Sequence, residues 1–140
     1  MIEQYCEYYP KSLISAGSYR VVMATDTAPD GSTAADEPLY VDGEANLNAL
    51  VDEHDVVLTD FYADWCGPCQ ALEPIVETVA EETEATVAKV DVDANQQLAA
   101  TYGVRGVPTL VLFADGEQVE EIVGLTGEQQ LRSLVESYAA

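Results

Sequence analysis

The 140-residue sequence predicts an α/β fold with a central mixed β-sheet flanked by helices. Strand-length apolar runs alternate with segments in which apolar residues recur every three to four positions, as they do on one face of a helix. The last two strand-like runs are separated by Asp115-Gly116, a dipeptide typical of a hairpin turn. The alternation of strand-like and helix-like segments predicts a sheet layer covered by helices. The hairpin predicts that part of the sheet is antiparallel.

The first elements are assigned in order from Pro38. A short strand is expected over 39–41, and a helix follows that ends at His54-Asp55. The run 56–63 is almost continuously apolar, which is the pattern of a central strand covered on both faces. Asp60 interrupts this run, and an ionised carboxylate is costly to bury in such a place.

The remaining elements follow Gly67-Pro68, where apolar spacing again predicts a helix. Alternation over 87–93 predicts a strand with Lys89 on one face and Val90 on the other. A short helix is then expected, followed by the two hairpin strands and a final helix. The residues expected to face inward from that final helix are Leu131, Leu134, Val135 and Tyr138.

The composition excludes several classes of function. The chain carries 26 acidic and 5 basic residues, for a net charge of −21, which argues against nucleic acid and anionic membrane surfaces as partners. No apolar run reaches the length of a membrane span, and no signal peptide is visible, so a soluble cytoplasmic protein is expected. Because 48% of the residues are apolar, the charge indicates an acidic surface adapted to high salt, not disorder.

The first 22 residues differ in composition from the rest. They are electrically neutral and hold four of the eight tyrosines together with Cys6, while residues 24–38 are acidic and lack an apolar period. We therefore expect residues 1–36 to form a disordered extension and residues 37–140 to form the domain. Residues 1–22 are either an appendage with its own partner or lie upstream of a true start at Met23. The second hypothesis is favoured, because this stretch has no apolar pattern with which to join a core.

The strongest motif is Trp65-Cys66-Gly67-Pro68-Cys69, at the passage from a strand to a helix. Unpaired N–H groups and the helix dipole at that position should stabilise a thiolate on Cys66, the expected nucleophile. Pro68 suits the first helical turn, and Cys69 can face back within disulfide reach. Cys69, which lies further under cover, is then the expected resolving thiol in a thiol-disulfide exchange.

The alternative for a C-x-x-C motif is half of a structural zinc site. The candidate ligands are Cys6, His54, Cys66 and Cys69, formally enough for a site with three cysteines and one histidine. The strand-to-helix position favours redox chemistry instead. We expect no metal and no cofactor, and we assign His54 only a role at the end of its helix.

Several blocks of sequence keep the spacing of one known family. They are Asp60-Phe61-Tyr62-Ala63-Asp64-Trp65-Cys66-Gly67-Pro68-Cys69, Pro74, Lys89-Val90-Asp91-Val92-Asp93, Tyr102-Gly103-Val104-Arg105-Gly106-Val107-Pro108-Thr109, Phe113, Gly116 and Gly124. On these blocks residues 37–140 resemble the thioredoxin family, which implies the thioredoxin fold. Residues 1–36 lie outside the resemblance.

The resemblance implies roles for two charged residues. Asp60 would lie beneath the disulfide and assist proton transfer at Cys69, and burial should raise the pKa of its carboxyl group. Lys89 would be the ammonium partner of Asp60. The alternatives are a partly exposed Asp60 at a strand edge and a Lys89 that neutralises Asp91 and Asp93.

The resemblance also implies a surface that binds substrate. The Val107-Pro108 bond would be cis and lie against the disulfide, with the backbone of Val107 bound to the substrate chain. Gly106 and Gly124 would keep this surface flat, and Trp65, together with Gly67 and Pro68, would complete its rim. Gln70 replaces a basic residue common in the family, and Asp64 and Glu73 add negative charge, which leaves the redox potential open.

The predicted activity is that of a general cytoplasmic protein-disulfide reductase, because the resemblance associates Gly-Pro between the cysteines with reductases. One alternative is a dedicated donor to a single partner, such as a peroxide-reducing enzyme or a methionine sulfoxide reductase. Another is a binding or holdase subunit that does not use its thiols. No nucleotide-binding motif is present, so a thioredoxin reductase or an equivalent donor must recycle the chain. Disulfide-containing proteins are the expected clients, and a monomer is expected.

Overall fold

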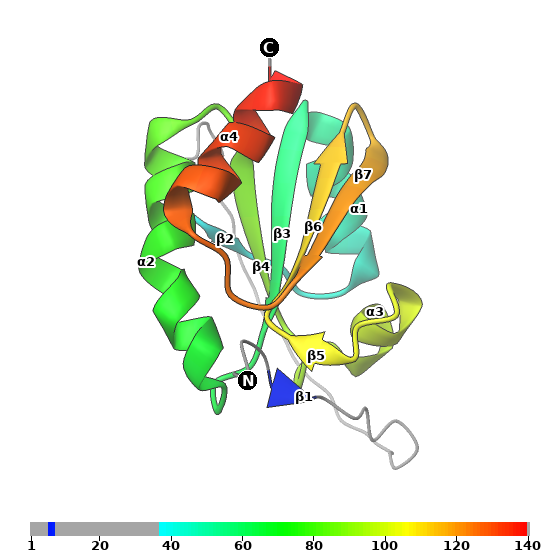
Figure 1. Cartoon of the computed structure of the whole chain (residues 1–140). Helices are drawn as coiled ribbons and strands as arrows, with labels where there is room; N and C mark the ends of the chain where they lie inside the picture. The colour runs from blue at the N-terminus through cyan, green and yellow to red at the C-terminus, as the bar shows by residue number, and fades with distance from the viewer. Residues whose placement is uncertain (1–5, 8–36, 140) are drawn as a thin grey trace.

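The computed structural model describes residues 6–7 and 37–139 (Figure 1). Its main part is a five-stranded sheet in the order β2-β4-β3-β6-β7. The strands of this sheet are β2 (Leu39–Tyr40), β3 (Val56–Tyr62), β4 (Thr86–Asp91), β6 (Thr109–Ala114) and β7 (Glu117–Val123). The helices are α1 (Glu44–Glu53), α2 (Gly67–Glu82), α3 (Gln96–Thr101) and α4 (Glu128–Ala139). Two short strands, β1 (Cys6–Glu7) and β5 (Gly106–Val107), pair with each other.

The sheet is mixed, as the sequence predicts. Strands β2 and β3 run parallel to β4, whereas β6 runs antiparallel to both β3 and β7. The hairpin between β6 and β7 turns at Asp115 and Gly116, whose φ angles of 55° and 86° suit this dipeptide. Strand β3 thus lies at the centre, with its C-terminal end leading directly into α2.

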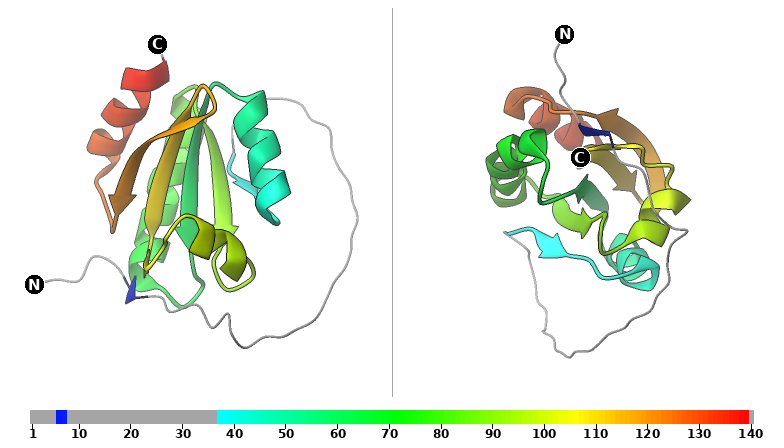
Figure 2. Two further views of the ribbon diagram at one scale, coloured as in Figure 1. Left: turned by 90° about the vertical axis from the view of Figure 1, so that its right-hand side faces the viewer. Right: turned by 90° about the horizontal axis from the view of Figure 1, so that it is seen from below.

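Two apolar layers cover the sheet. Helices α1 and α3 lie on one face, and α2 and α4 lie on the other (Figures 1 and 2). The buried residues form two clusters, one containing Phe61 and Leu47 and the other containing Leu58, Leu72 and Leu131. Both faces of β3 and β4 are therefore covered, so polar side chains within these strands are buried too, namely Thr59, Asp60, Thr86 and Lys89.

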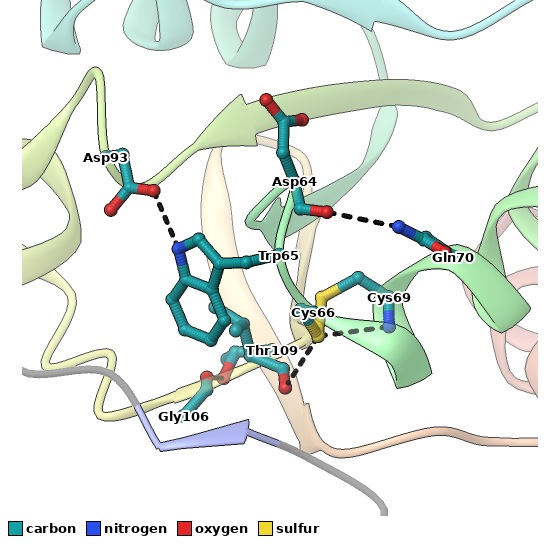
Figure 3. The surroundings of a disulfide bond; sticks show 9 residues. Asp64, Trp65, Cys66, Cys69, Gln70, Asp93, Gly106 and Thr109 are labelled. Atoms are coloured by element: carbon teal, nitrogen blue, oxygen red, sulfur yellow. Dashed lines mark hydrogen bonds between the residues drawn. A yellow bond between two sulfur atoms is a disulfide. The ribbon is translucent and has the colours of Figure 1, made fainter.

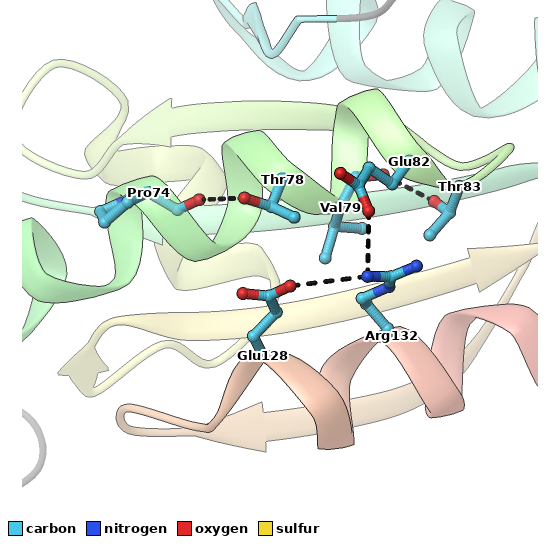
Figure 4. A network of polar contacts seen from close by, with 7 residues as sticks. All are labelled: Pro74, Thr78, Val79, Glu82, Thr83, Glu128 and Arg132. Carbon is cyan, nitrogen blue, oxygen red and sulfur yellow. Dashed lines mark hydrogen bonds and ion pairs between the residues drawn. The ribbon is translucent and has the colours of Figure 1, made fainter.

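Helix α4 is joined to α2 by charge as well as by apolar packing. Arg132 Nη1 lies 3.0 Å from Glu82 Oε1 and 3.6 Å from Glu128 Oε2 (Figure 4). Half-exposed ion pairs of this kind contribute little to stability. Burial of the apolar face of α4 therefore supplies most of the stabilising free energy.

One inward-facing residue of the final helix was wrongly predicted. Tyr138 is 36% exposed, and its hydroxyl group donates a hydrogen bond to Glu120 Oε2 at 2.7 Å. The buried face of α4 continues from Leu131 through Val135 to the partly buried Ala139, in steps of four residues. Because Tyr138 lies to one side of this line of residues, its phenol ring is at the edge of the buried face of α4, where the hydroxyl group reaches a carboxylate.

Most residues of the expected N-terminal extension lie outside the described residues, including those around Met23. Cys6 and Glu7 are described, and they pair with β5 in an antiparallel register. The apolar period of the sequence gives no indication of this contact, because two residues are too few to show a period.

Candidate active site at the start of helix α2

The cysteine motif forms the N-terminus of α2. Cys66 is the N-cap residue, and its Sγ accepts a hydrogen bond from the backbone N–H of Cys69 at 3.1 Å (Figure 3). Pro68 lies in the first turn, where a missing N–H removes no helical hydrogen bond. Cys66 and Cys69 form a disulfide, with their Cα atoms 5.2 Å apart. One end of a helix thus holds both sulfur atoms.

A second segment, distant from the motif in sequence, lies against the disulfide. The Val107-Pro108 peptide bond is cis, and the carbonyl oxygen of Val107 lies 3.4 Å from Cys66 Sγ. The Pro108 carbonyl accepts a hydrogen bond from Gly124 N at 2.8 Å, and Gly124 has a φ of 99°, a value that favours glycine. Thr109 Oγ1 donates to the Gly106 carbonyl at 2.6 Å, which fixes the other end of this segment.

The rim of the site is partly apolar. Trp65 is 52% exposed, and its indole Nε1 donates a hydrogen bond to Asp93 Oδ2 at 2.8 Å (Figure 3). Gln70 Nε2 donates to the Asp64 carbonyl at 3.1 Å on the other side of the motif. Gly67 is exposed and Pro68 is half-buried at the start of the helix. An exposed ring held in place by a hydrogen bond can offer a fixed apolar surface to another chain.

Both active-site cysteines are buried. Cys66 is 0% exposed and Cys69 is 5% exposed, although sequence reasoning expected cover mainly for Cys69. Gly106 and Val107 are buried as well, and β1 pairs with these two residues. The partly buried Cys6 packs against the apolar cluster that contains both active-site cysteines. Cys66 is therefore less accessible than its motif alone suggests, and β1 pairs with the segment beside it.

Asp60 occupies the middle of β3 and is only 1% exposed. It lies directly opposite Lys89 in the parallel pair with β4, and its Oδ1 has no hydrogen-bond partner among the described residues. Burial raises the pKa of Asp60 to about 7, the charge of Lys89 opposes this rise, and the charge of Glu73 adds to it. The carboxyl group is thus poised to exchange a proton near neutral pH.

Lys89 is buried and forms an ion pair with a residue that sequence reasoning did not connect to it. Its Nζ lies 3.0 Å from Glu73 Oε2, and the same ammonium group lies 4.6 Å from the centre of the Tyr62 ring. Glu73 follows Cys69 by four positions on α2, a spacing that puts both on one side of the helix and could have revealed the contact.

A cavity of about 450 Å³ lies beside these groups, and Cys69, Glu73 and Lys89 are among the residues that line it. It gives Cys69 and the Lys89–Glu73 ion pair a route to solvent. The charges of Lys89 on β4 and Glu73 on α2 therefore lie on the Cys69 side of the disulfide.

Among residues 6–7 and 37–139, no group of three or more His, Cys, Asp or Glu side chains could hold a metal ion. The Nδ1 of His54 lies 3.1 Å from the carbonyl oxygen of Leu50, within hydrogen-bond distance at the end of α1. No helix in this part of the chain is long and apolar enough to cross a membrane.

The chain is similar to known proteins over most of its length. The sequence model of the thioredoxin family matches residues 39–137. The chain is similar to a solved mutant thioredoxin from Halobacterium salinarum, with 66% identity, a TM-score of 0.76 and coverage of 79% of this chain and 97% of that chain.

The chain also resembles curated thioredoxins from organisms that are not halophilic archaea. It is 43% identical to the thioredoxin of Porphyra purpurea over 68% of this chain and 92% of that protein. It is 45% identical to the thioredoxin of Chlamydia pneumoniae over 60% of this chain and 83% of that protein. The chain therefore belongs to the thioredoxin family, with the thioredoxin fold and the protein-disulfide reductase activity of its members.

Proposed function

We propose that Cys66 attacks the disulfide of a client protein and that Cys69 resolves the mixed disulfide. The first step joins Cys66 Sγ to one client sulfur and releases the other as a thiolate. In the second step Cys69 attacks Cys66 Sγ, which releases the reduced client and leaves the Cys66–Cys69 disulfide. The observation that carries this assignment is the place of Cys66 at the N-terminus of α2, where the N–H of Cys69 points at its sulfur.

Asp60 is the proposed base for the resolving step. A proton must leave the thiol of Cys69 before this sulfur can attack, and the buried carboxyl group has its pKa raised to about 7. Lys89 and Glu73 are proposed to set the pKa of Asp60, because the charges of both residues act on its carboxyl group. Both residues also line the cavity beside Cys69.

The backbone of Val107 is the proposed binding edge for the client. Its carbonyl oxygen lies beside Cys66 Sγ, so an extended client segment paired there would bring its own disulfide to the nucleophile. The exposed ring of Trp65 supports apolar contact with the client. Gly67, Pro68, Gly106, Pro108 and Gly124 are the remaining proposed substrate-binding residues, of which Gly106, Pro108 and Gly124 are buried.

A separate reductase of the thioredoxin reductase class or an equivalent donor is proposed to return Cys66 and Cys69 to the dithiol form. The cytoplasm is the proposed location, because reduced thiols persist there. The high identity to a thioredoxin of Halobacterium salinarum and the net charge of −21 support work at high salt, and the chain is proposed to act as a monomer.

Reduction of insulin by dithiothreitol at high salt tests this function. The chain is expected to accelerate the reaction, and Cys66→Ser is expected to abolish the acceleration because no nucleophile remains. The exposed substitution Ser137→Ala serves as the control and should leave the rate unchanged. A chain that binds insulin but does not accelerate its reduction would favour a thiol-independent binding subunit.

A further inference from the structure

Strand β1 occupies the backbone edge that the proposed function assigns to clients. It pairs antiparallel with β5, with Cys6 opposite Val107 and Glu7 opposite Gly106. Figures 1 and 2 show this two-residue strand against β5, outside the main sheet. Addition of an extended segment to a free strand edge is one of the common ways in which proteins bind peptides.

The register brings the third cysteine of the chain toward the disulfide. Opposing residues of an antiparallel pair have Cα atoms about 4.5–5.5 Å apart. Cys6 is therefore close to Val107, whose carbonyl oxygen lies 3.4 Å from Cys66 Sγ. Cys6 is partly buried against the cluster that contains Cys66, whereas Glu7 is exposed. Since successive side chains of a strand alternate in direction, the thiol faces inward and its neighbour faces away.

We propose that β1 is an internal client, and that Cys6 exchanges with the Cys66–Cys69 disulfide. This proposal rests on the proposed function, because it uses the same binding edge and the same nucleophile. The thiolate of Cys6 attacks Cys66 Sγ, forms a Cys6–Cys66 disulfide and releases Cys69 as a thiolate. The proton lost by Cys6 is balanced by the proton that Cys69 gains. Attack by Cys69 reverses the step, and no external oxidant or reductant is consumed.

The internal client also controls access to the site. Cys66 and Val107 are both 0% exposed, and β1 pairs with Val107, so an external client that binds this edge must displace β1. Because β1 belongs to the same chain, it competes with every client at a local concentration that dilution of the protein does not lower. The tether therefore favours clients whose strands bind this edge better than Cys6 and Glu7 do.

The test measures the disulfide between Cys6 and Cys66 in a full chain that lacks the resolving thiol. Cys69→Ser leaves only these two cysteines, and the chain, at about 10 μM, is equilibrated in glutathione buffers of graded ratio. The fraction in the Cys6–Cys66 form, measured by acid quenching, alkylation and peptide mapping, gives the effective concentration of one thiol toward the other.

The matched control moves the thiol by one residue. In the Cys69→Ser background, Cys6→Ser combined with Glu7→Cys keeps the tether and the number of thiols but turns the sulfur away from the site. We expect the effective concentration to be at least about tenfold lower in this control. Equal values in the two variants would overturn the proposal, and so would disulfides formed mainly between separate chains.

A third measurement separates this proposal from the proposed function. If the unmodified chain does not accelerate insulin reduction, the proposed function fails. If it does so while the two register variants form the disulfide equally well, only the internal client fails.

Discussion

Asp60 is a carboxyl group in the middle of a central strand, and its surroundings give it a pKa of about 7. As the proposed base, it is active only when ionised, so the rate of the resolving step should rise with pH through about 7. We expect Asp60→Asn to slow this step by about 10²-fold at pH 8 and to remove the inflection. Single-turnover release of a thiol from a mixed disulfide, measured from pH 5.5 to 9, checks this. An inflection that stays near 7 in the variant would contradict the assignment.

Glu73 acts on the same carboxyl group from α2. Its charge raises the pKa of Asp60, and its ion pair with Lys89 offsets part of the ammonium charge that lowers that pKa. Glu73→Gln should therefore move the inflection of the resolving step to lower pH. Glu77→Gln removes an equal charge from an exposed position one turn further along α2 and serves as the matched control. If both variants shift the inflection equally, only the net charge matters and Glu73 has no specific role.

The pKa of Asp60 also predicts how stability depends on pH. Because the folded pKa lies near 7 and the unfolded value is 3.8, folding favours the protonated form. This contribution to stability is fully present below pH 3.8 and is lost as pH rises through 7. Asp60→Asn should therefore raise the free energy of unfolding at pH 8.5 by up to about 4 kcal/mol, and by less at pH 5.5. Urea unfolding of both proteins at the two pH values measures these gains. A gain of the same size at pH 5.5 and pH 8.5 would refute the prediction.

At the scale of elements, the loop after β7 fixes the cis Val107-Pro108 segment through one hydrogen bond. Gly124 donates this bond to the Pro108 carbonyl from a backbone with φ of 99°. Gly124→Ala should cost about 1–2 kcal/mol, because a Cβ atom is disfavoured in this conformation. Gly67→Ala, at an ordinary φ with nothing within 4 Å of the added Cβ, is the control and should not destabilise. Urea midpoints of both variants decide whether the conformation of Gly124 is the cause.

The order of strands and helices was predictable from local pattern, and the resemblance to the thioredoxin family predicted the cis Val107-Pro108 bond and the burial of Asp60. Period and turn chemistry revealed β3, α2 and the hairpin at Asp115, because each depends on neighbours in sequence. The Lys89 contact with Glu73 and the cover over Cys66 depend on segments far apart in the chain. Tyr138 was misplaced because the period of a helix does not show how its last turn rotates relative to a sheet.

At the scale of the whole molecule, the excess of acidic residues predicts that the stability of the fold depends on salt concentration. A net charge of −21 repels itself in the compact state, and screening shortens from about 10 Å at 0.1 M salt to about 3 Å at 1 M. We expect the free energy of unfolding to rise steadily between 0.1 and 2 M KCl. Chemical denaturation by urea, which adds no ions, measures this at each salt concentration. A stability that stays flat over this range would contradict the adaptation to salt.

In the proposed mechanism, the fold presents the thiol of Cys66 to a client and keeps the thiol of Cys69 next to it for the resolving step. The most direct test is capture of oxidised insulin by the full chain carrying Cys6→Ser and Cys69→Ser, in which no second thiol can release the captured insulin, followed by peptide mapping of the adduct. The mechanism predicts a stable mixed disulfide through Cys66 that dithiothreitol reduces, and its absence when Cys66→Ser is added. No adduct in the double variant, while the unmodified chain accelerates insulin reduction, would contradict the assignment of Cys66 as the nucleophile.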